Sequence, residues 1–224
     1  MRRRRSPPNR VPELERRLAD LQRSHGPAHE STLAAMNDLA AALVEQGEAE
    51  RARKLQEASL AMNRRVHGRD HPAVLDLASR LAATCFAAGD VATARSLQTE
   101  VVETRLRVLG EHAPDTLAAK SGLGRVLAAS GELDRARDLY REVLEARREI
   151  LGEDAPATLG AMTSLATTLH LSGEHDEARA LYEHVLERRR ALLGDDHPKT
   201  LTARLNLERA GRTEGGQDAG RDDE

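Results

Sequence analysis

The chain has 224 residues, of which 39% are hydrophobic, 32% are charged and only 1% are aromatic. A compact globule of this size normally uses more large rings to fill its centre, so the composition favours thin layers of closely packed helices. The formal net charge of −3 is too small to predict a nucleic-acid partner, and no apolar run approaches the roughly 20 residues of a membrane span.

The first segment, residues 1–11, is basic and polar, and we expect it to form a disordered tail. The run Arg2–Arg5 is not followed by an apolar stretch, so the segment does not have the pattern of a secretory signal. Lacking both a signal and a membrane span, the chain is expected in the cytoplasm. Only three of its 34 basic residues are lysine, a bias that suggests a bacterial source.

A 42-residue repeat organises the rest of the chain. A leucine recurs at that interval, and so do two glycines, which together account for nine of the sixteen glycines. Such a period predicts a stack of equivalent units. The three series are Leu33, Leu75, Leu117, Leu159 and Leu201; Gly26, Gly68, Gly110, Gly152 and Gly194; and Gly47, Gly89, Gly131 and Gly173.

Each unit is predicted to contain two helices. The first begins near a proline such as Pro72, because proline fits the first helical turn, and ends at a glycine such as Gly89. The second carries an apolar stripe at spacings of three and four and ends at the next glycine. The expected pairs are 29–46 with 48–67, 71–88 with 90–109, 113–130 with 132–151, and 155–172 with 174–193.

These helices predict a single domain over residues 12–210. Its four repeats span about 28–69, 70–111, 112–153 and 154–195, with half repeats at 12–27 and 196–210. Residues 211–224 lack apolar periodicity, and we expect them to form a disordered acidic tail.

The stretch Gly68-Arg69-Asp70-His71-Pro72, followed by Leu75, Gly89, Ala94 and Leu109-Gly110, resembles the 42-residue tetratricopeptide repeat of kinesin light chains and many bacterial proteins. The resemblance covers residues 12–210. It implies an all-α, right-handed superhelical solenoid of antiparallel helix pairs, in which the first helix of each pair lines a concave groove.

The resemblance also implies where a partner binds, because it places one row of first-helix residues at the centre of the groove. Close relatives carry paired asparagines in this row, whereas this chain keeps only Asn37. We expect a shallow, nearly neutral groove that suits an apolar or helical peptide. Phe86 either anchors that peptide or packs between repeats. The partner-binding candidates are Asn37, Ser79, Phe86, Ser121, Arg125, Thr163 and His170.

Several other residues have a metal-like or reactive pattern, but we favour a structural role for each. His25 with His29, and His67 with His71, have metal-ligand spacing that later repeats do not keep, so loop structure is expected. Cys85 takes the place of core leucines. Gly124 is expected at a close helix contact. The ladder Arg105, Arg147 and Arg189 could bind an acidic partner, but we favour pairing with acidic side chains of adjacent helices.

Stacked helix pairs offer a long rigid surface without a convergent pocket, and no acid, base or nucleophile cluster stands apart from the repeat. We therefore expect no enzyme activity, no cofactor and no metal. The expected function is a scaffold that binds a protein or peptide partner, with no nucleic acid or membrane involved. The alternative is a detached sensor or regulatory module of a bacterial signalling system that acts with a separate nucleotide-switch or protease partner.

Overall fold

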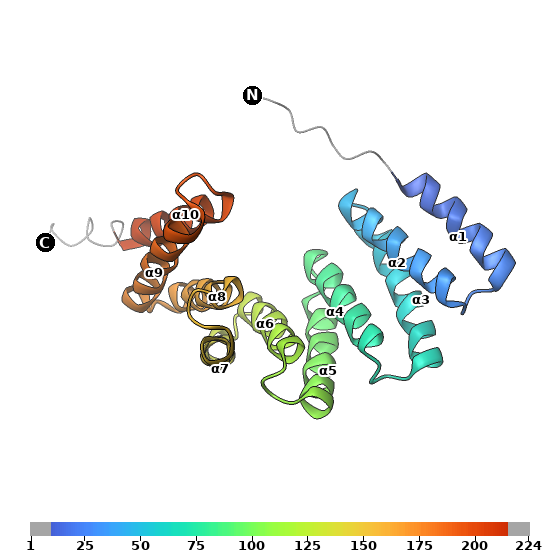
Figure 1. Cartoon of the computed structure of the whole chain (residues 1–224), viewed down its shortest axis with the longest axis horizontal. Helices are drawn as coiled ribbons and strands as arrows, with labels where there is room; N and C mark the ends of the chain where they lie inside the picture. Colours follow the sequence, from blue (N-terminus) through green and yellow to red (C-terminus); the bar gives the residue numbers. More distant parts are fainter. Residues whose placement is uncertain (1–9, 215–224) are drawn as a thin grey trace, which may run out of the picture. The chain divides into compact units, whose positions relative to one another are not determined.

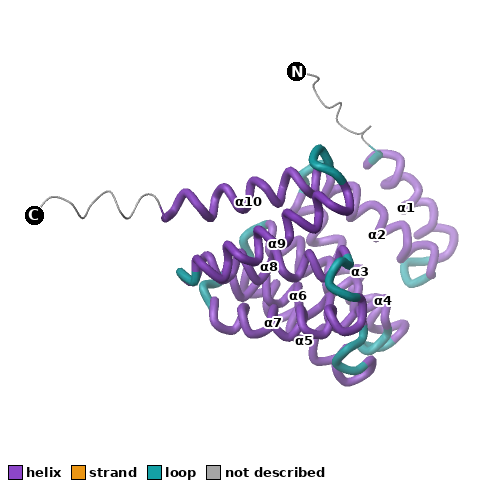
Figure 2. The backbone as a smooth tube through the Cα atoms, turned by 60° about the vertical axis from the view of Figure 1, so that its left-hand side comes forward, coloured by secondary structure: helices purple, strands orange, loops and turns teal. Residues whose placement is uncertain are grey.

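The computed structural model describes residues 10–214, and over this range the secondary structure is helical, with no strand (Figure 2). Ten helices are joined by short loops. They are α1 (Val11–His25), α2 (Glu30–Glu45), α3 (Ala49–His67), α4 (Pro72–Ala87), α5 (Val91–Leu109), α6 (Pro114–Ala129), α7 (Leu133–Leu151), α8 (Pro156–Ser172), α9 (His175–Leu193) and α10 (Pro198–Glu214).

Over the described residues the chain divides into two compact units, one with α1–α5 and the other with α6–α10. Figure 1 labels these helices. Within each unit, every helix packs on the helix that follows it in sequence. This arrangement confirms the four helix pairs and the solenoid of helical repeats that the glycine spacing predicts.

The ends of the described range differ from the expected boundaries. Helix α1 begins at Val11, whose side chain is buried, so Val11 belongs to the folded part and not to the tail. Helix α10 continues to Glu214, four residues past the expected end at residue 210. The rest of the two expected tails, residues 1–9 and 215–224, lies outside the described residues.

Local signals explain where the helices begin and end. Histidines cap three first helices. Nδ1 of His29 accepts a hydrogen bond from the backbone N–H of Ser31. In the same way, Nδ1 of His71 accepts from Ala73 and Nδ1 of His197 accepts from Lys199. At the other end of α8, Gly173 takes the left-handed conformation with φ of 88°. A side chain at Gly173 would strain the backbone, which is why glycine marks this helix end.

The core lies where the two helices of a pair meet. The alanine of each second helix is fully buried, and this small residue lets the helices approach closely. The series is Ala52, Ala94, Ala136 and Ala178. Cys85 is also fully buried, as expected for a core position, and desolvation raises the pKa of its thiol.

One buried position breaks the apolar pattern. Lys120 of α6 lies where Met36 and Met162 lie in other repeats, and its side chain is only 5% exposed. Its ammonium group donates hydrogen bonds of 3.0 Å to Glu111 and to Glu142. Burial pulls the pKa of Lys120 down, but these two carboxylates outweigh it and raise the pKa above its ordinary value.

Candidate functional site: two grooves between helices

The first unit contains a groove of about 510 Å³, lined mainly from α2 and α4, which we call the apolar groove. Its wall is mostly small and aliphatic, and Val44 within it is 46% exposed. The polar or charged side chains are Asn37, Glu45, Gln56, Arg80 and Thr84. The apolar lining comes from Ala40, Ala41, Val44, Ala49, Leu77, Ala83 and Ala87.

The apolar groove contains only part of the expected row. Asn37 and Val44 line it from α2, but α4 contributes residues such as Arg80 and Ala83, while Ser79 and Phe86 are not among its lining residues. Other equivalent positions do line it from both helices, since Ala41 and Ala83 are 42 residues apart, as are Glu45 and Ala87. Phe86 is half-buried on α4.

The side chain of Asn37 is fixed by a hydrogen bond from the neighbouring helix α3. Its Oδ1 accepts a hydrogen bond of 2.9 Å from Oγ of Ser59 on α3. Asn63 in turn donates to the backbone carbonyl of Ser59. The Asn37 amide is therefore positioned at the edge of the apolar groove by a contact that the sequence pattern does not reveal.

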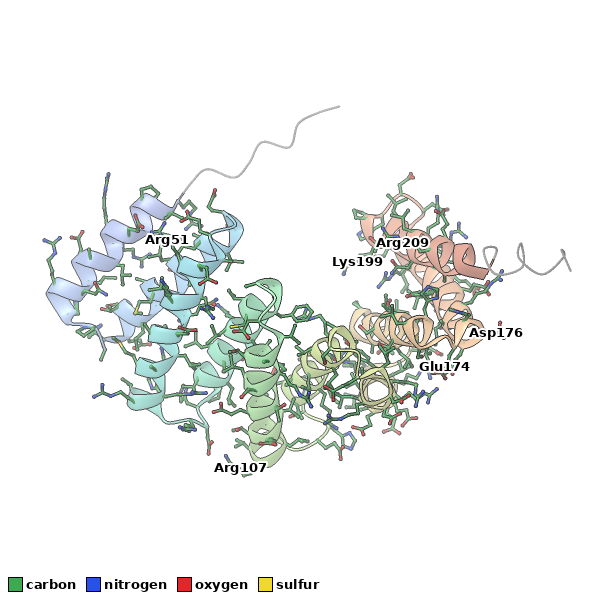
Figure 3. All side chains as sticks on the ribbon, turned by 180° about the vertical axis from the view of Figure 1, so that it is seen from behind. Arg51, Arg107, Glu174, Asp176, Lys199 and Arg209 are labelled. Carbon is green, nitrogen blue, oxygen red and sulfur yellow. The ribbon has the colours of Figure 1, made fainter. Side chains whose placement is uncertain are left out.

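The second unit contains another groove of about 510 Å³, at the start of α8, the end of α9 and the start of α10, which we call the basic groove. Thr163, one of the expected partner-binding residues, lines it. Lys199, labelled in Figure 3, lines it from the start of α10. The other lining residues are Asp154, Pro156, Leu159, Gly160, Arg189, Leu192, Leu193, His197 and Thr202.

The arginine ladder does not behave as one set. Arg105 is buried and pairs with Asp76 at 2.5 Å, as expected. The expectation of acidic partners is wrong for Arg147 and Arg189, which are half-buried and donate instead to backbone carbonyls of the next helix, Ala157 at 3.0 Å and Lys199 at 3.1 Å. Burial without a compensating carboxylate lowers the pKa of both guanidinium groups.

Three further candidates lie in the second unit but outside the lining of the basic groove. Ser121 is half-buried, and its hydroxyl donates to the carbonyl of Leu117 at 2.8 Å. Arg125 is exposed on α6. His170 lies in the last turn of α8, with 3.2 Å between its Nδ1 atom and that of His175. These contacts do not bring Ser121, Arg125 and His170 together in one pocket.

The histidine pairs flank the loops between helices, and His29 and His71 cap the helices that follow. The rings of His25 and His29 have centroids 4.7 Å apart, and those of His67 and His71 stack at 4.6 Å. Over residues 10–214, no group of three or more His, Cys, Asp or Glu side chains is arranged to hold a metal ion. None of the helices in that same range combines the length and hydropathy of a membrane span.

The comparisons with known proteins agree with this architecture. The family model of the tetratricopeptide repeat matches residues 31–107, 74–149, 115–191 and 157–218. No curated protein matches the chain in sequence. Among solved structures, the nearly identical TPR-like repeats of a protein described as a kinesin light chain of P. anserina share 27% identity at a TM-score of 0.73, over 82% of this chain and 87% of that one.

Two more distant structures show the same fold. BtubC (BKLC) of P. vanneervenii has 16% identity and a TM-score of 0.71, and the match covers 96% of this chain and 93% of BtubC. The MamA protein has 13% identity and a TM-score of 0.57, over 85% of this chain and 98% of MamA. Because the family model matches most of the chain, from residue 31 to residue 218, the protein belongs to the tetratricopeptide repeat family.

Proposed function

We propose that the protein is a non-catalytic scaffold that binds a peptide or helix of another protein between its first helices. The observation that carries this proposal is the apolar groove, which holds exposed aliphatic surface between helices of successive repeats. An amphipathic helix binds such a groove by burying its apolar face. The polar side chains Asn37, Glu45 and Arg80 are suited to fixing the orientation of the bound segment.

The small side chains of the apolar groove favour a ligand with large side chains. Ala41 and Ala83 are both exposed and line the groove from α2 and α4. Large apolar side chains of a partner would fill the space that these alanines leave. Burying each such side chain contributes about 1.5–3 kcal/mol before the cost of ordering is subtracted.

The test blocks the groove without touching the core. The full chain, the Ala83→Glu variant and the Ala58→Glu variant are immobilised, and bound proteins from the native cell are compared by quantitative mass spectrometry. Ala58 is exposed on α3 outside the groove, so its variant carries the same new charge on another face. We expect specific partners to be lost from Ala83→Glu and retained by Ala58→Glu. Equal retention by both variants would reject the apolar groove as the binding site.

A further inference from the structure

Arg189 in the basic groove is a cation that its own repeat does not neutralise. Its guanidinium donates to the carbonyl of Lys199 at 3.1 Å and to Oγ1 of Thr163 at 3.5 Å, and it forms no ion pair with a carboxylate in the described part of the chain. Neutral acceptors offset only part of the cost of burying a charge. The guanidinium has five N–H donors in a planar fork, so it retains donors for an anion.

The chain contains its own comparison for this site. In the 71–109 helix pair, the equivalent Arg105 is paired with Asp76 of the preceding first helix. The residue at the position of Asp76 is Ala118 in the next pair and Gly160 in the pair that carries Arg189. The carboxylate that neutralises Arg105 is therefore missing at the same structural position beside Arg189.

Gly160 leaves room for that carboxylate. A Cβ atom added at this glycine would meet no heavy atom within 4 Å, and Gly160 itself lines the basic groove. A group supplied from outside can therefore occupy the space that the Asp76 side chain fills in the earlier repeat.

The other lining residues define the chemistry of such a group. Lys199 adds a second cation that no described carboxylate pairs with, whereas the acidic Asp154 is already engaged by Arg188 through both of its oxygens. Leu192 and Leu193 are 51% and 44% exposed, so aliphatic surface flanks the cations. The groove is therefore complementary to a carboxylate that has apolar neighbours.

The preceding pair repeats this arrangement. Arg147 donates to Ala157 as Arg189 donates to Lys199, and positions 157 and 199 are equivalent. Ile150 and Leu151 beside it are 48% and 50% exposed. The combination of an unneutralised arginine and exposed aliphatic side chains thus occurs twice in the second unit.

We propose that the basic groove binds an acidic residue flanked by aliphatic residues in a partner peptide. The partner carboxylate takes at Arg189 the place that Asp76 takes at Arg105, and the aliphatic neighbours cover Leu192 and Leu193. This inference rests on the proposed scaffold function and adds the chemistry of the bound segment.

The test measures binding of a fluorescein-labelled peptide, Gly-Leu-Asp-Leu-Leu-Asp-Leu-Gly, and of its analogue with asparagine in place of aspartate. We expect the full chain to bind the aspartate peptide at least about ten-fold more tightly than the analogue, since charge-assisted bidentate bonds are the stronger class. The Arg189→Gln variant removes the cation, and Gly160→Asp supplies an internal carboxylate. Each should abolish the preference for aspartate.

Matched controls separate this site from general charge effects. Arg179→Gln removes an arginine of the same helix that pairs with Glu183, and it should keep the preference for aspartate. Arg189→Lys should keep only part of it, because an ammonium group cannot form the planar fork. Circular dichroism melts should show that every variant remains folded.

Three outcomes would overturn the proposal. Equal binding of the two peptides would reject recognition of an acidic residue by this groove. It would not bear on the scaffold function, which the Ala83→Glu comparison tests separately. Failure of both peptides to bind would also reject this groove. Binding of the aspartate peptide only in a variant with Asp222→Asn, Asp223→Asn and Glu224→Gln would show that the acidic end of this same chain is the occupant, and not a partner.

Discussion

The ring of Tyr140 lies directly against Gly124, so that a Cβ added at Gly124 would come within 2.9 Å of Cζ of Tyr140. The tyrosine hydroxyl donates to the carbonyl of Ser121 at 3.3 Å, which holds the ring across α6. Other repeats carry alanine at the position of Gly124, and two of them carry glutamine at the position of Tyr140. The ring of Tyr140 thus occupies the space that a Cβ at Gly124 would need, whereas Tyr182 packs against Ala166 in the next repeat.

This contact predicts that Gly124→Ala destabilises the protein, although alanine is normally the better helix former by about 0.5–1 kcal/mol. The expected net loss is about 1–2 kcal/mol, because overpacking forces the ring to shift. The double variant Gly124→Ala with Tyr140→Gln reproduces the pair Ala82 and Gln98 and should recover part of the loss. Thermal melts of the single and double variants measure the coupling, and strictly additive effects would contradict it.

The buried Lys120 predicts that Lys120→Met does not lower the melting temperature. Methionine already fills the equivalent positions at Met36 and Met162, and replacing a buried ion pair with a well-packed apolar residue is often neutral or stabilising. Breaking the network from the other side, with Glu142→Gln, should lower the melting temperature because the ammonium then loses one carboxylate. A large loss in Lys120→Met would show that the pair is needed for folding.

Ala136 is fully buried, and Ala136→Glu should be strongly destabilising. An unpaired carboxylate at the helix contact is expected to cost several kcal/mol, on the order of 3–5. Chemical denaturation followed by circular dichroism gives the value. The exposed Ala58 provides the control, since Ala58→Glu should change stability by less than about 0.5 kcal/mol.

The environment of Asp90 predicts that the stability of the protein depends on pH in the acid range. The backbone N–H of Thr93 donates to its carboxylate at 3.1 Å and caps α5, which lowers the pKa of Asp90. Since the folded pKa lies below the unfolded value of about 3.9, the contribution of Asp90 to stability is full above that pH and is lost as pH falls through the folded pKa.

The Asp90→Asn variant should therefore show a weaker fall in melting temperature below about pH 4 than the parent. Glu132 occupies the equivalent position at the start of α7 but makes no side-chain capping bond, so Glu132→Gln should alter this part of the profile less. Identical acid profiles for the parent and Asp90→Asn would show that the capping bond does not contribute.

The helices could be predicted from the sequence because glycine and proline mark their ends by local backbone chemistry. Gly173 and Pro156, for example, bound the helix that the period places between them. The different partners of Arg105 and Arg189 could not be predicted from the repeat. The two arginines occupy equivalent positions, but the residue that each contacts belongs to a neighbouring helix and differs between repeats. The signal was present, since an aspartate at position 76 replaces the small residues at 118 and 160, but the repeat alone does not show that these positions face the arginines.

The candidate site could be predicted in part. Asn37 and Thr163 line grooves, whereas Ser79 and Phe86 do not line the apolar groove with Asn37. A different row of the repeat lines that groove from both helices, since Ala41 and Ala83 are also 42 residues apart.

The central claim is that a partner protein occupies the space between first helices, and site-specific photo-crosslinking in the native cell tests it most directly. A photoreactive amino acid is placed at Ala83 in the apolar groove and, in a separate chain, at Ala58, which is exposed on α3 and does not line the groove. A partner in this space should give a discrete crosslinked product from position 83 and none from position 58. Crosslinks to the same partner from position 58 alone would contradict it.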